Sequence, residues 1–158
     1  TIGNFTPRAA VDLVSTVRER MSDSDFFLLG VDLRKDPLVI ERAYNDSQGI
    51  TALFNRNILA VINAGLGADF DISRFDHDAT YNQDEHRIEM RLVSRGGQEV
   101  NIPGVGHVTF ADGESILTEL SYKYDRALAE DVLGRSGLRL HEWLTDDSGT
   151  FALVLAAL

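Results

Sequence analysis

The chain has 158 residues, and its 15 Lys and Arg against 25 Asp and Glu give a formal net charge of −10. This length is typical of one compact domain, and 44% hydrophobic with 25% charged residues is the balance of a globular protein. The acidic charge argues against a nucleic-acid partner, because phosphate contacts need clustered Lys and Arg. With no cysteine, disulfides and thiolate metal sites are excluded, and a cytoplasmic location is expected. No apolar run approaches the roughly 20 residues of a membrane helix, so no membrane partner is expected.

The first part of the chain alternates helix and strand. The pair Thr6-Pro7 is typical of a helix start, since threonine caps the first turn and proline lacks the N–H that would be unpaired there; apolar spacing extends this helix to about Met21. The run 26–33 is apolar on both alternating faces, which predicts a strand buried inside a parallel sheet. The pair Asp36-Pro37 opens a second, short helix through Tyr44.

A third helix is expected from 49 to about 64, and glycines at 65 and 67 end it. Its apolar residues share one face: Ile50, Leu53, Phe54, Ile58, Val61 and Ile62. The middle third then contains short alternating segments separated by turn residues, which predicts an antiparallel meander. The segments are 79–81, 87–94, 99–102, 107–110 and 115–124.

The end of the chain returns to the pattern of its beginning. Asp125 caps a helix that runs to about Arg135, and strands are expected at 138–144 and 151–158. The fold class is therefore α/β, with the meander inserted between its outer parts.

Histidine spacing predicts no metal site, because no two histidines stand at metal-ligand spacing on one element. We expect all four at the surface or at strand ends: His77, His86, His107 and His141.

Several blocks spread over the whole chain resemble histidine-specific, S-adenosylmethionine-dependent methyltransferases. The best-known members of this family make trimethylated histidine in ergothioneine biosynthesis. The blocks are Thr-Ile-Gly-Asn at 1–4, Gly-Val-Asp-Leu-Arg-Lys-Asp-Pro at 30–37, the run 43–51, the run 54–63 that begins Phe-Asn-Arg-Asn, Arg-Ile-Glu-Met at 87–90, and Thr-Glu-Leu-Ser-Tyr-Lys-Tyr at 118–124.

The resemblance implies the C-terminal part of a Rossmann-like methyltransferase sheet that carries an inserted α+β antiparallel substrate-binding domain. Residues 1–48 would be core, 49–124 the inserted domain, and 125–158 the last helix and two strands of the core. The family's Glu-x-Gly-x-Gly loop for S-adenosyl-L-methionine has no counterpart in these residues. We therefore assign no cofactor-binding residue and expect the main cofactor motif outside this chain.

The resemblance also implies substrate-binding residues. Asn4 resembles the asparagine that holds the substrate's amino and carboxylate groups, and Tyr44 resembles the tyrosine that donates to the same carboxylate. Phe54 and Met90 resemble the apolar wall of the substrate pocket. Without the resemblance, Asn4 is a turn or cap residue, Tyr44 a half-buried aromatic at a helix end, and Phe54 and Met90 members of a helix and a strand core face.

Glu119 and Ser121 are two residues apart on a predicted strand, so both side chains project to the same face. In the family this pair binds the two ring nitrogens of the substrate imidazole. A carboxylate accepts from one N–H, while a hydroxyl either donates to or accepts from the other nitrogen. The alternative is a solvent-facing pair on an edge strand.

The function implied is that of an enzyme, an S-adenosylmethionine-dependent methyltransferase that acts on the α-amine of an amino acid, histidine. This half alone is expected to be inactive, and no residue is assigned as catalytic base. The alternative is a standalone amino-acid-binding or regulatory module. A third possibility is a ligand-free structural remnant, whose exposed sheet edge we expect to pair in a homodimer.

Overall fold

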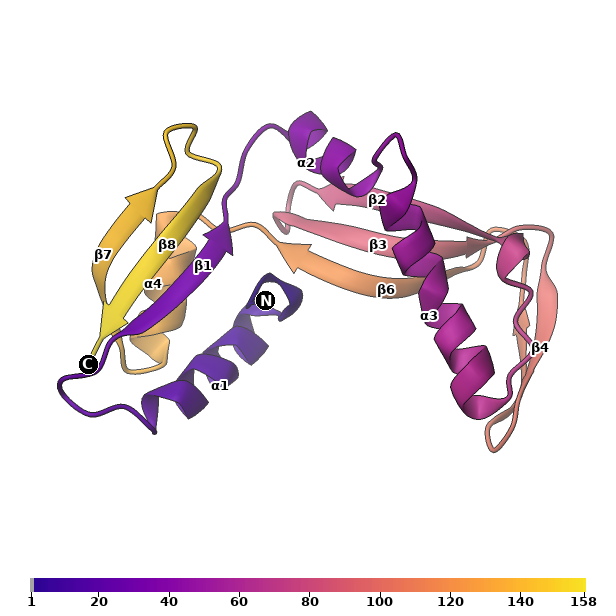
Figure 1. Ribbon diagram of the computed structural model, residues 1–158, viewed down its shortest axis with the longest axis horizontal. Coiled ribbons are helices and arrows are strands. Elements are labelled where there is room, and N and C mark those ends of the chain that lie inside the picture. Colours follow the sequence, from indigo (N-terminus) through magenta and orange to yellow (C-terminus); the bar gives the residue numbers. More distant parts are fainter. Residues whose placement is uncertain (1) are drawn as a thin grey trace. The chain divides into compact units, whose positions relative to one another are not determined.

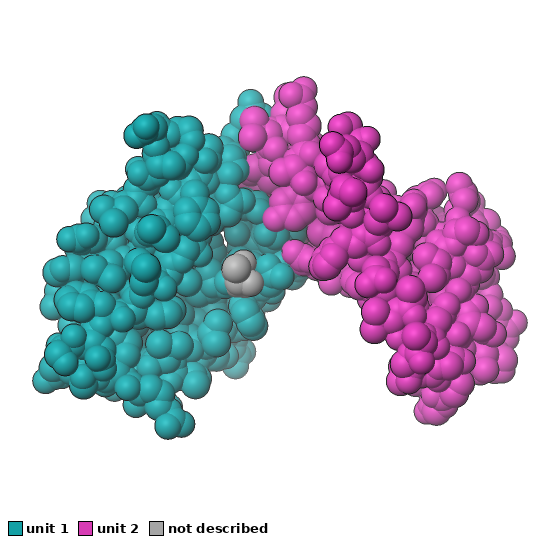
Figure 2. Space-filling model, viewed as in Figure 1, with its two compact units in different colours: residues 1–36, 82–88, 120–158 teal, residues 37–81, 89–119 magenta. Residues whose placement is uncertain are grey.

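The computed structural model describes residues 2–158, so Thr1 of the first family-like block lies outside the described residues. The chain forms two compact units (Figure 2). Unit 1 contains residues 1–36, 82–88 and 120–158, and unit 2 contains residues 37–81 and 89–119. Each is described by itself.

Unit 1 contains most of the predicted outer elements. They are η1 (Ile2–Asn4), α1 (Pro7–Arg18), β1 (Phe27–Asp32), α4 (Arg126–Arg135), β7 (Arg139–Thr145) and β8 (Phe151–Ala157). The predicted helix caps are confirmed, since the Thr6 side chain accepts from the backbone N–H of Ala9 and the Asp125 side chain accepts from that of Leu128. The sequence thus located these helix starts correctly.

The strand expected at 26–33 forms as β1, but the expectation of burial inside a parallel sheet is wrong. Both β1 and β7 pair antiparallel with β8, in the order β1-β8-β7 (Figure 1). In the described residues β1 is an edge strand, and an isolated parallel bridge joins Leu33 to Tyr124. A continuous apolar run has the same pattern in a buried strand and in an edge strand whose second face is apolar but open.

The core of unit 1 lies between one face of this sheet and two helices. Alternate residues of β1 and β8, among them Val31 and Val154, bury that face against Val14 of α1 and Val132 of α4. The opposite face carries exposed apolar side chains: Leu28, Leu144, Phe151 and Leu153. One face of the sheet is thus packed and the other is apolar and open.

Unit 2 contains the remaining helices and most of the middle strands. They are α2 (Pro37–Tyr44), α3 (Ile50–Leu66), η2 (Ile72–Arg74), β2 (Phe75–Asn82), β3 (Arg87–Ser94), β4 (Gln98–Ile102), β5 (Gly106–Phe110) and β6 (Ser115–Tyr122). The ends of β2, β3 and β6 are counted with unit 1. All five strands expected in this region form.

The meander is interrupted, which corrects the predicted connectivity. The sheet order is β2-β3-β6, and β4 and β5 form an antiparallel pair of their own. The chain leaves the larger sheet after Ser94 and returns to it just before β6. There the Ser94 N–H donates to Glu114 O at 2.8 Å, and Ser94 O accepts from the Gly113 N–H at 2.8 Å. These two bonds join the end of β3 directly to the turn before β6, so β6 rather than β4 becomes the neighbour of β3.

The side of α3 that faces the core differs from the expected one. Ile50, Leu53, Phe54 and Val61 are 59–63% exposed. Facing inward are the fully buried Asn55 and the core residue Leu59. The core below contains a cluster of rings from Phe70, Phe75 and Phe110, with Phe75 and Phe110 edge to face at 5.4 Å. The apolar stripe correctly predicted the helix but not its buried side.

Candidate functional site

The six predicted site residues are divided between the two units. Asn4 and Ser121 belong to unit 1, and the other four belong to unit 2: Tyr44, Phe54, Met90 and Glu119. The geometry of each is therefore given within its own unit.

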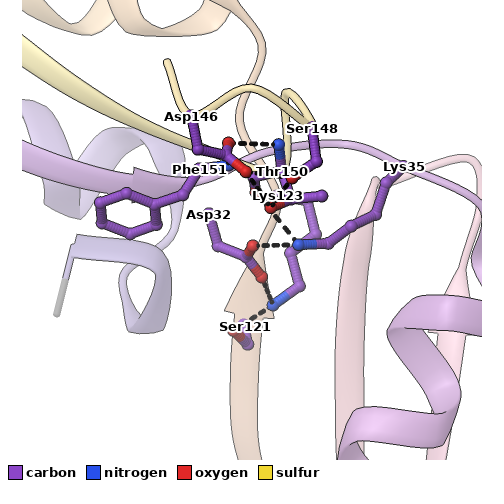
Figure 3. Close-up of polar contacts among 8 residues, drawn as sticks. All are labelled: Asp32, Lys35, Ser121, Lys123, Asp146, Ser148, Thr150 and Phe151. Atoms are coloured by element: carbon purple, nitrogen blue, oxygen red, sulfur yellow. Dashed lines mark hydrogen bonds and ion pairs between the residues drawn. The ribbon is translucent and has the colours of Figure 1, made fainter. Parts of the chain in front are cut away.

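Ser121 belongs to a polar cluster at the carboxyl ends of β1 and β6 (Figure 3). Lys123 Nζ, on a side chain that is 1% exposed, lies 3.0 Å from Ser121 Oγ and 2.9 Å from Asp32 Oδ2. The other carboxylate oxygen of Asp32 accepts from Lys35 Nζ at 2.5 Å. We call these four residues the Asp32 cluster. Because an ammonium group only donates, the Ser121 oxygen accepts the bond from Lys123.

The Asp32 cluster has unequal electrostatics at its two ends. Burial raises the pKa of Asp32, but hydrogen bonds and positive charge from Lys35 and Lys123 outweigh it, so this pKa lies below the ordinary carboxyl value. The Asp32 side chain is 39% exposed, whereas Lys123 is almost fully enclosed. Asp32 therefore stabilises the charged form of Lys123 more than Lys123 stabilises the charged form of Asp32, which water also solvates.

The same cluster fastens the β7–β8 turn. Lys35 Nζ donates to Thr150 O at 3.1 Å. Asp146 shapes this turn, because it accepts from the Ser148 hydroxyl and from the N–H groups of Thr150 and Phe151 at 2.7 and 2.9 Å. The hydrogen bond from Ser148, followed by that from Phe151, lowers the pKa of Asp146. Segments distant in sequence are thus held at one end of the unit 1 sheet (Figure 3).

Asn4 is exposed at the end of η1, and the preceding Gly3 explains how this turn approaches β6. A Cβ atom at Gly3 would lie 2.9 Å from the backbone oxygen of Tyr122 and 3.8 Å from Ser121 Oγ. Only glycine fits so close to a backbone oxygen. The structure therefore brings the turn that carries Asn4 against the end of the strand that carries Ser121. The cap of α1 is Thr6, not Asn4.

Tyr44 is half-buried at the end of α2, and β2 holds this end by three hydrogen bonds. His77 Nε2 lies 2.9 Å from Tyr44 O. The Asn45 amide donates to Ala79 O at 2.8 Å. The backbone N–H of Tyr81 donates to the Glu41 carboxylate at 3.0 Å.

His77 is also fixed from the opposite side of its ring. Asn55 Nδ2, on the buried face of α3, lies 2.9 Å from His77 Nδ1 and 3.0 Å from Arg91 O of β3. Asn55 Oδ1 is buried and accepts no hydrogen bond within residues 2–158. A half-buried histidine inside β2 thus connects α3 to the end of α2, and its expected position at the surface or a strand end is wrong.

The remaining predicted residues differ in exposure. Met90 is 2% exposed, on a strand whose backbone accepts from the Thr118 hydroxyl at 3.1 Å. Glu119, the next residue along β6, is half-buried, and no hydrogen bond to its carboxylate is found in the described part of the chain. Phe54 is 63% exposed, so the alternative that placed it in a helix core is wrong for this chain.

Four residues that carry much of this geometry were not identified from the sequence: Asp32, Asn55, His77 and Lys123. All but His77 lie inside family-like blocks, where a strand end, an amide within an apolar helix and a lysine after a strand were the available signals. For residues 2–158, no helix is long and apolar enough to cross a membrane, and no group of three or more metal-binding side chains occurs.

Comparison with known proteins places the chain in a family. A family model described as "Histidine-specific methyltransferase, SAM-dependent" matches residues 1–158. The chain belongs to the histidine-specific methyltransferase family. It is 46% identical over 157 residues to "Histidine N-alpha-methyltransferase" of Mycolicibacterium smegmatis, covering 99% of this chain and 49% of that protein. It is 27% identical over 143 residues to "Ergothioneine biosynthesis protein 1" of Schizosaccharomyces pombe, covering 89% and 18%.

A solved S-adenosylmethionine-dependent methyltransferase from Clostridium acetobutylicum is a more distant match. It has 9% identity and a TM-score of 0.48, and the match covers 100% of this chain and 55% of that one. This likeness is too remote to argue from. The chain spans about half the length of its relative from Mycolicibacterium smegmatis.

The described residues do not by themselves fit S-adenosylmethionine. A cofactor of this type is usually held where a glycine-rich connection leads from a strand into a helix. The two strand-to-helix connections, 33–36 before α2 and 123–125 before α4, contain no glycine. Both are instead occupied by side chains of the Asp32 cluster or its neighbours. We therefore derive no step through the cofactor for this chain.

Proposed function

We propose that this chain is the substrate-binding half of an enzyme that transfers a methyl group from S-adenosyl-L-methionine to the α-amine of histidine. The observation that carries the proposal is family membership over all 158 residues, together with 46% identity to a histidine N-alpha-methyltransferase. Because the chain spans 49% of that relative, we assign the main cofactor site to the part of the longer protein that this chain does not span.

Glu119 and Ser121 are proposed to select the imidazole side chain. They lie on β6 two residues apart and on the same face of the strand, Glu119 half-buried and Ser121 7% exposed. Neutral imidazole has one N–H donor and one acceptor nitrogen, so it matches a carboxylate and a hydroxyl. An indole ring has one N–H and no acceptor, and an aliphatic side chain has neither. Such ligands cannot match both the carboxylate and the hydroxyl, so we expect them to bind less well than imidazole.

Asn4 and Tyr44 are proposed to hold the amino-acid end of the substrate. An amide both donates and accepts, so Asn4 suits the α-amine and the carboxylate together, and the Tyr44 hydroxyl donates to the carboxylate. Phe54 and Met90 are proposed as the apolar wall. The contribution of these residues is orientation, because holding a nucleophile in line with its partner lowers the barrier without acid–base chemistry. No residue of this chain is assigned as the base that removes the proton of the α-amine.

The fold that accompanies this function is proposed to be the end of a Rossmann-like core with an inserted substrate-binding domain. The division into two units, with the chain leaving unit 1 twice, supports an insertion. The order β1-β8-β7, with an antiparallel β8 in the middle, supports the end of a larger sheet. We expect this half alone to be inactive and the enzyme to be cytoplasmic.

The test is a methyl-transfer assay of the full-length protein that contains this chain, with S-adenosylmethionine and each of the twenty amino acids in turn. We expect kcat/KM for histidine to exceed that for every other amino acid by about 100-fold or more. Methylation of tryptophan or leucine at a similar rate would refute selection of imidazole. The alternative, a binding module without catalysis, predicts no methyl transfer but measurable histidine binding by calorimetry.

A further inference from the structure

A continuous hydrogen-bonded path leads from the inside of α3 to the end of α2, entirely within unit 2. Asn55 binds the ring of His77, and His77 binds the backbone carbonyl of Tyr44. We propose that Asn55 and His77 are positioning residues, which fix one tautomer of His77 so that its Nε2–H holds Tyr44 in the orientation that binds the substrate carboxylate. This inference rests on the proposed function, in which Tyr44 contacts that carboxylate.

The tautomer follows from the partners of each ring nitrogen. Tyr44 O is a carbonyl and only accepts, so His77 Nε2, 2.9 Å away, must carry the hydrogen. On the opposite side, Arg91 O is also a carbonyl, so the Asn55 atom 3.0 Å from it must be the NH2 group. That group directs its second hydrogen at His77 Nδ1, 2.9 Å away, which must therefore be the unprotonated acceptor. The Tyr44 end requires a hydrogen on Nε2 and the Asn55 end requires none on Nδ1, so together they specify the neutral ring with hydrogen on Nε2.

The observed orientation of the Asn55 amide leaves its oxygen without a hydrogen bond in the described residues. Its side chain is fully buried, both amide hydrogens are used, and its Oδ1 accepts nothing within residues 2–158. Rotating the amide would turn Oδ1 toward Arg91 O, replacing a hydrogen bond by a contact between two acceptors. A buried acceptor without a partner is unfavourable, so the observed orientation is maintained by what the two hydrogens bind. Asn55 therefore acts on His77 rather than filling space.

The position of His77 makes it specific for Tyr44. Two further hydrogen bonds join this end of α2 to the β2 backbone, but they use the side chains of Asn45 and Glu41. The His77 bond alone among these three ends on the residue proposed to contact substrate. Loss of this bond should therefore leave α2 attached to β2 while removing the hydrogen bond that β2 makes to the Tyr44 backbone.

Two substitutions separate the two functions of the ring. Glutamine at 77 can place an amide N–H near the Nε2 position, so His77→Gln keeps the donor to Tyr44. Asparagine reaches only the Nδ1 position, so His77→Asn keeps an acceptor for Asn55 and loses the donor. The control is His107→Asn, the same substitution at a side chain that is 68% exposed in the same unit.

The experiment measures the full-length protein in two ways. A two-bond ¹H–¹⁵N spectrum, with His77→Gln identifying the signal, should show His77 neutral with hydrogen on Nε2. Steady-state kinetics should show that His77→Asn raises KM for histidine about 10-fold with kcat nearly unchanged, since a carboxylate contact binds substrate and transition state alike. The inhibition constant of histamine, which has the imidazole but no carboxylate, should not change. His77→Gln and His107→Asn should stay within about 3-fold of wild type.

Each of the other possible results contradicts a different step of this proposal. Hydrogen on Nδ1, or on both nitrogens, at neutral pH would refute the hydrogen bond from Asn55 to His77 Nδ1 and thus the role of Asn55 in fixing the tautomer. Equal effects of His77→Asn and His77→Gln, or equal weakening of histidine and histamine, would refute the specific action on Tyr44 and leave a structural role. If His77 has the expected tautomer but the protein does not methylate histidine, the proposed function and the substrate role of Tyr44 are refuted. The hydrogen-bonded path from Asn55 through His77 to Tyr44 would still stand.

Discussion

The Asp32 cluster makes an asymmetric prediction, because its two charged partners differ in burial. Asp32→Asn removes the carboxylate that lies 2.9 Å from the Lys123 ammonium, while the Lys123 side chain stays enclosed at 1% exposure. Removing one member of a buried ion pair costs about 3–5 kcal/mol when the other stays buried and charged. Lys123→Met instead leaves Asp32 bonded to Lys35 and 39% exposed, so the loss is nearer the value of one charged hydrogen bond, about 1.5–3 kcal/mol. We therefore expect the Asp32→Asn variant to be the less stable by about 2 kcal/mol.

Urea unfolding of the 158-residue chain measures this difference. Trp143 is the single tryptophan and packs against the unit 1 core, so its fluorescence reports the unit that contains the cluster. The double variant should be more stable than Asp32→Asn alone, since Lys123→Met removes the buried positive charge that has lost the Asp32 carboxylate. Asp131→Asn, which breaks an exposed pair with Arg135, is the matched control and should cost less than about 0.5 kcal/mol. Equal losses for Asp32→Asn and Asp131→Asn would refute the reasoning.

Three further outcomes are expected. The Asn63 amide bonds both the N–H and the O of Phe70, so Asn63→Leu should lower thermal stability by about 2–3 kcal/mol in a circular dichroism melt, and no loss would contradict this. Backbone N–H groups at the start of α3 lower the pKa of Asp46 to about 2. The stabilisation of α3 by the Asp46 carboxylate is therefore complete above the ordinary carboxyl pKa and is lost as the pH falls toward 2. Asp46→Ala should remove this pH dependence, measured by amide exchange in the first turn of α3. Gly3→Ala should destabilise by about 1–3 kcal/mol because its Cβ would lie 2.9 Å from a backbone oxygen, whereas Gly65→Ala, with open space around it, should be neutral or stabilising.

Local signals in the sequence were sufficient to predict the helices and strands, but not which residues or strands pack against them. Thr6 and Asp125 located helix starts because a cap acts on neighbouring backbone groups. The buried side of α3 was not predictable, since Asn55 is buried only because His77 and Arg91 O, 22 and 36 residues away, satisfy its amide. Pairing of β1 with β8 was equally invisible, because an apolar strand carries no information on which strand lies beside it.

The candidate site follows the same division. The six predicted residues came from the family resemblance, and their roles remain predictions. The supporting contacts of Ser121 and Tyr44, namely Lys123 and His77, come from sequence-distant elements that only the folded chain brings together. A lysine after a strand and a histidine in a polar segment have many ordinary explanations in sequence, so neither was singled out.

The central claim is that this chain recognises the imidazole of histidine through Glu119. The most direct measurement is the ratio of kcat/KM for histidine to that for tryptophan in the full-length protein, for wild type, Glu119→Ala and the control Glu99→Ala, whose carboxylate is 66% exposed on β4. Loss of one charged hydrogen bond to the substrate should lower the ratio by about 10- to 100-fold in Glu119→Ala and leave it unchanged in Glu99→Ala. An unchanged preference for histidine in Glu119→Ala would contradict the account.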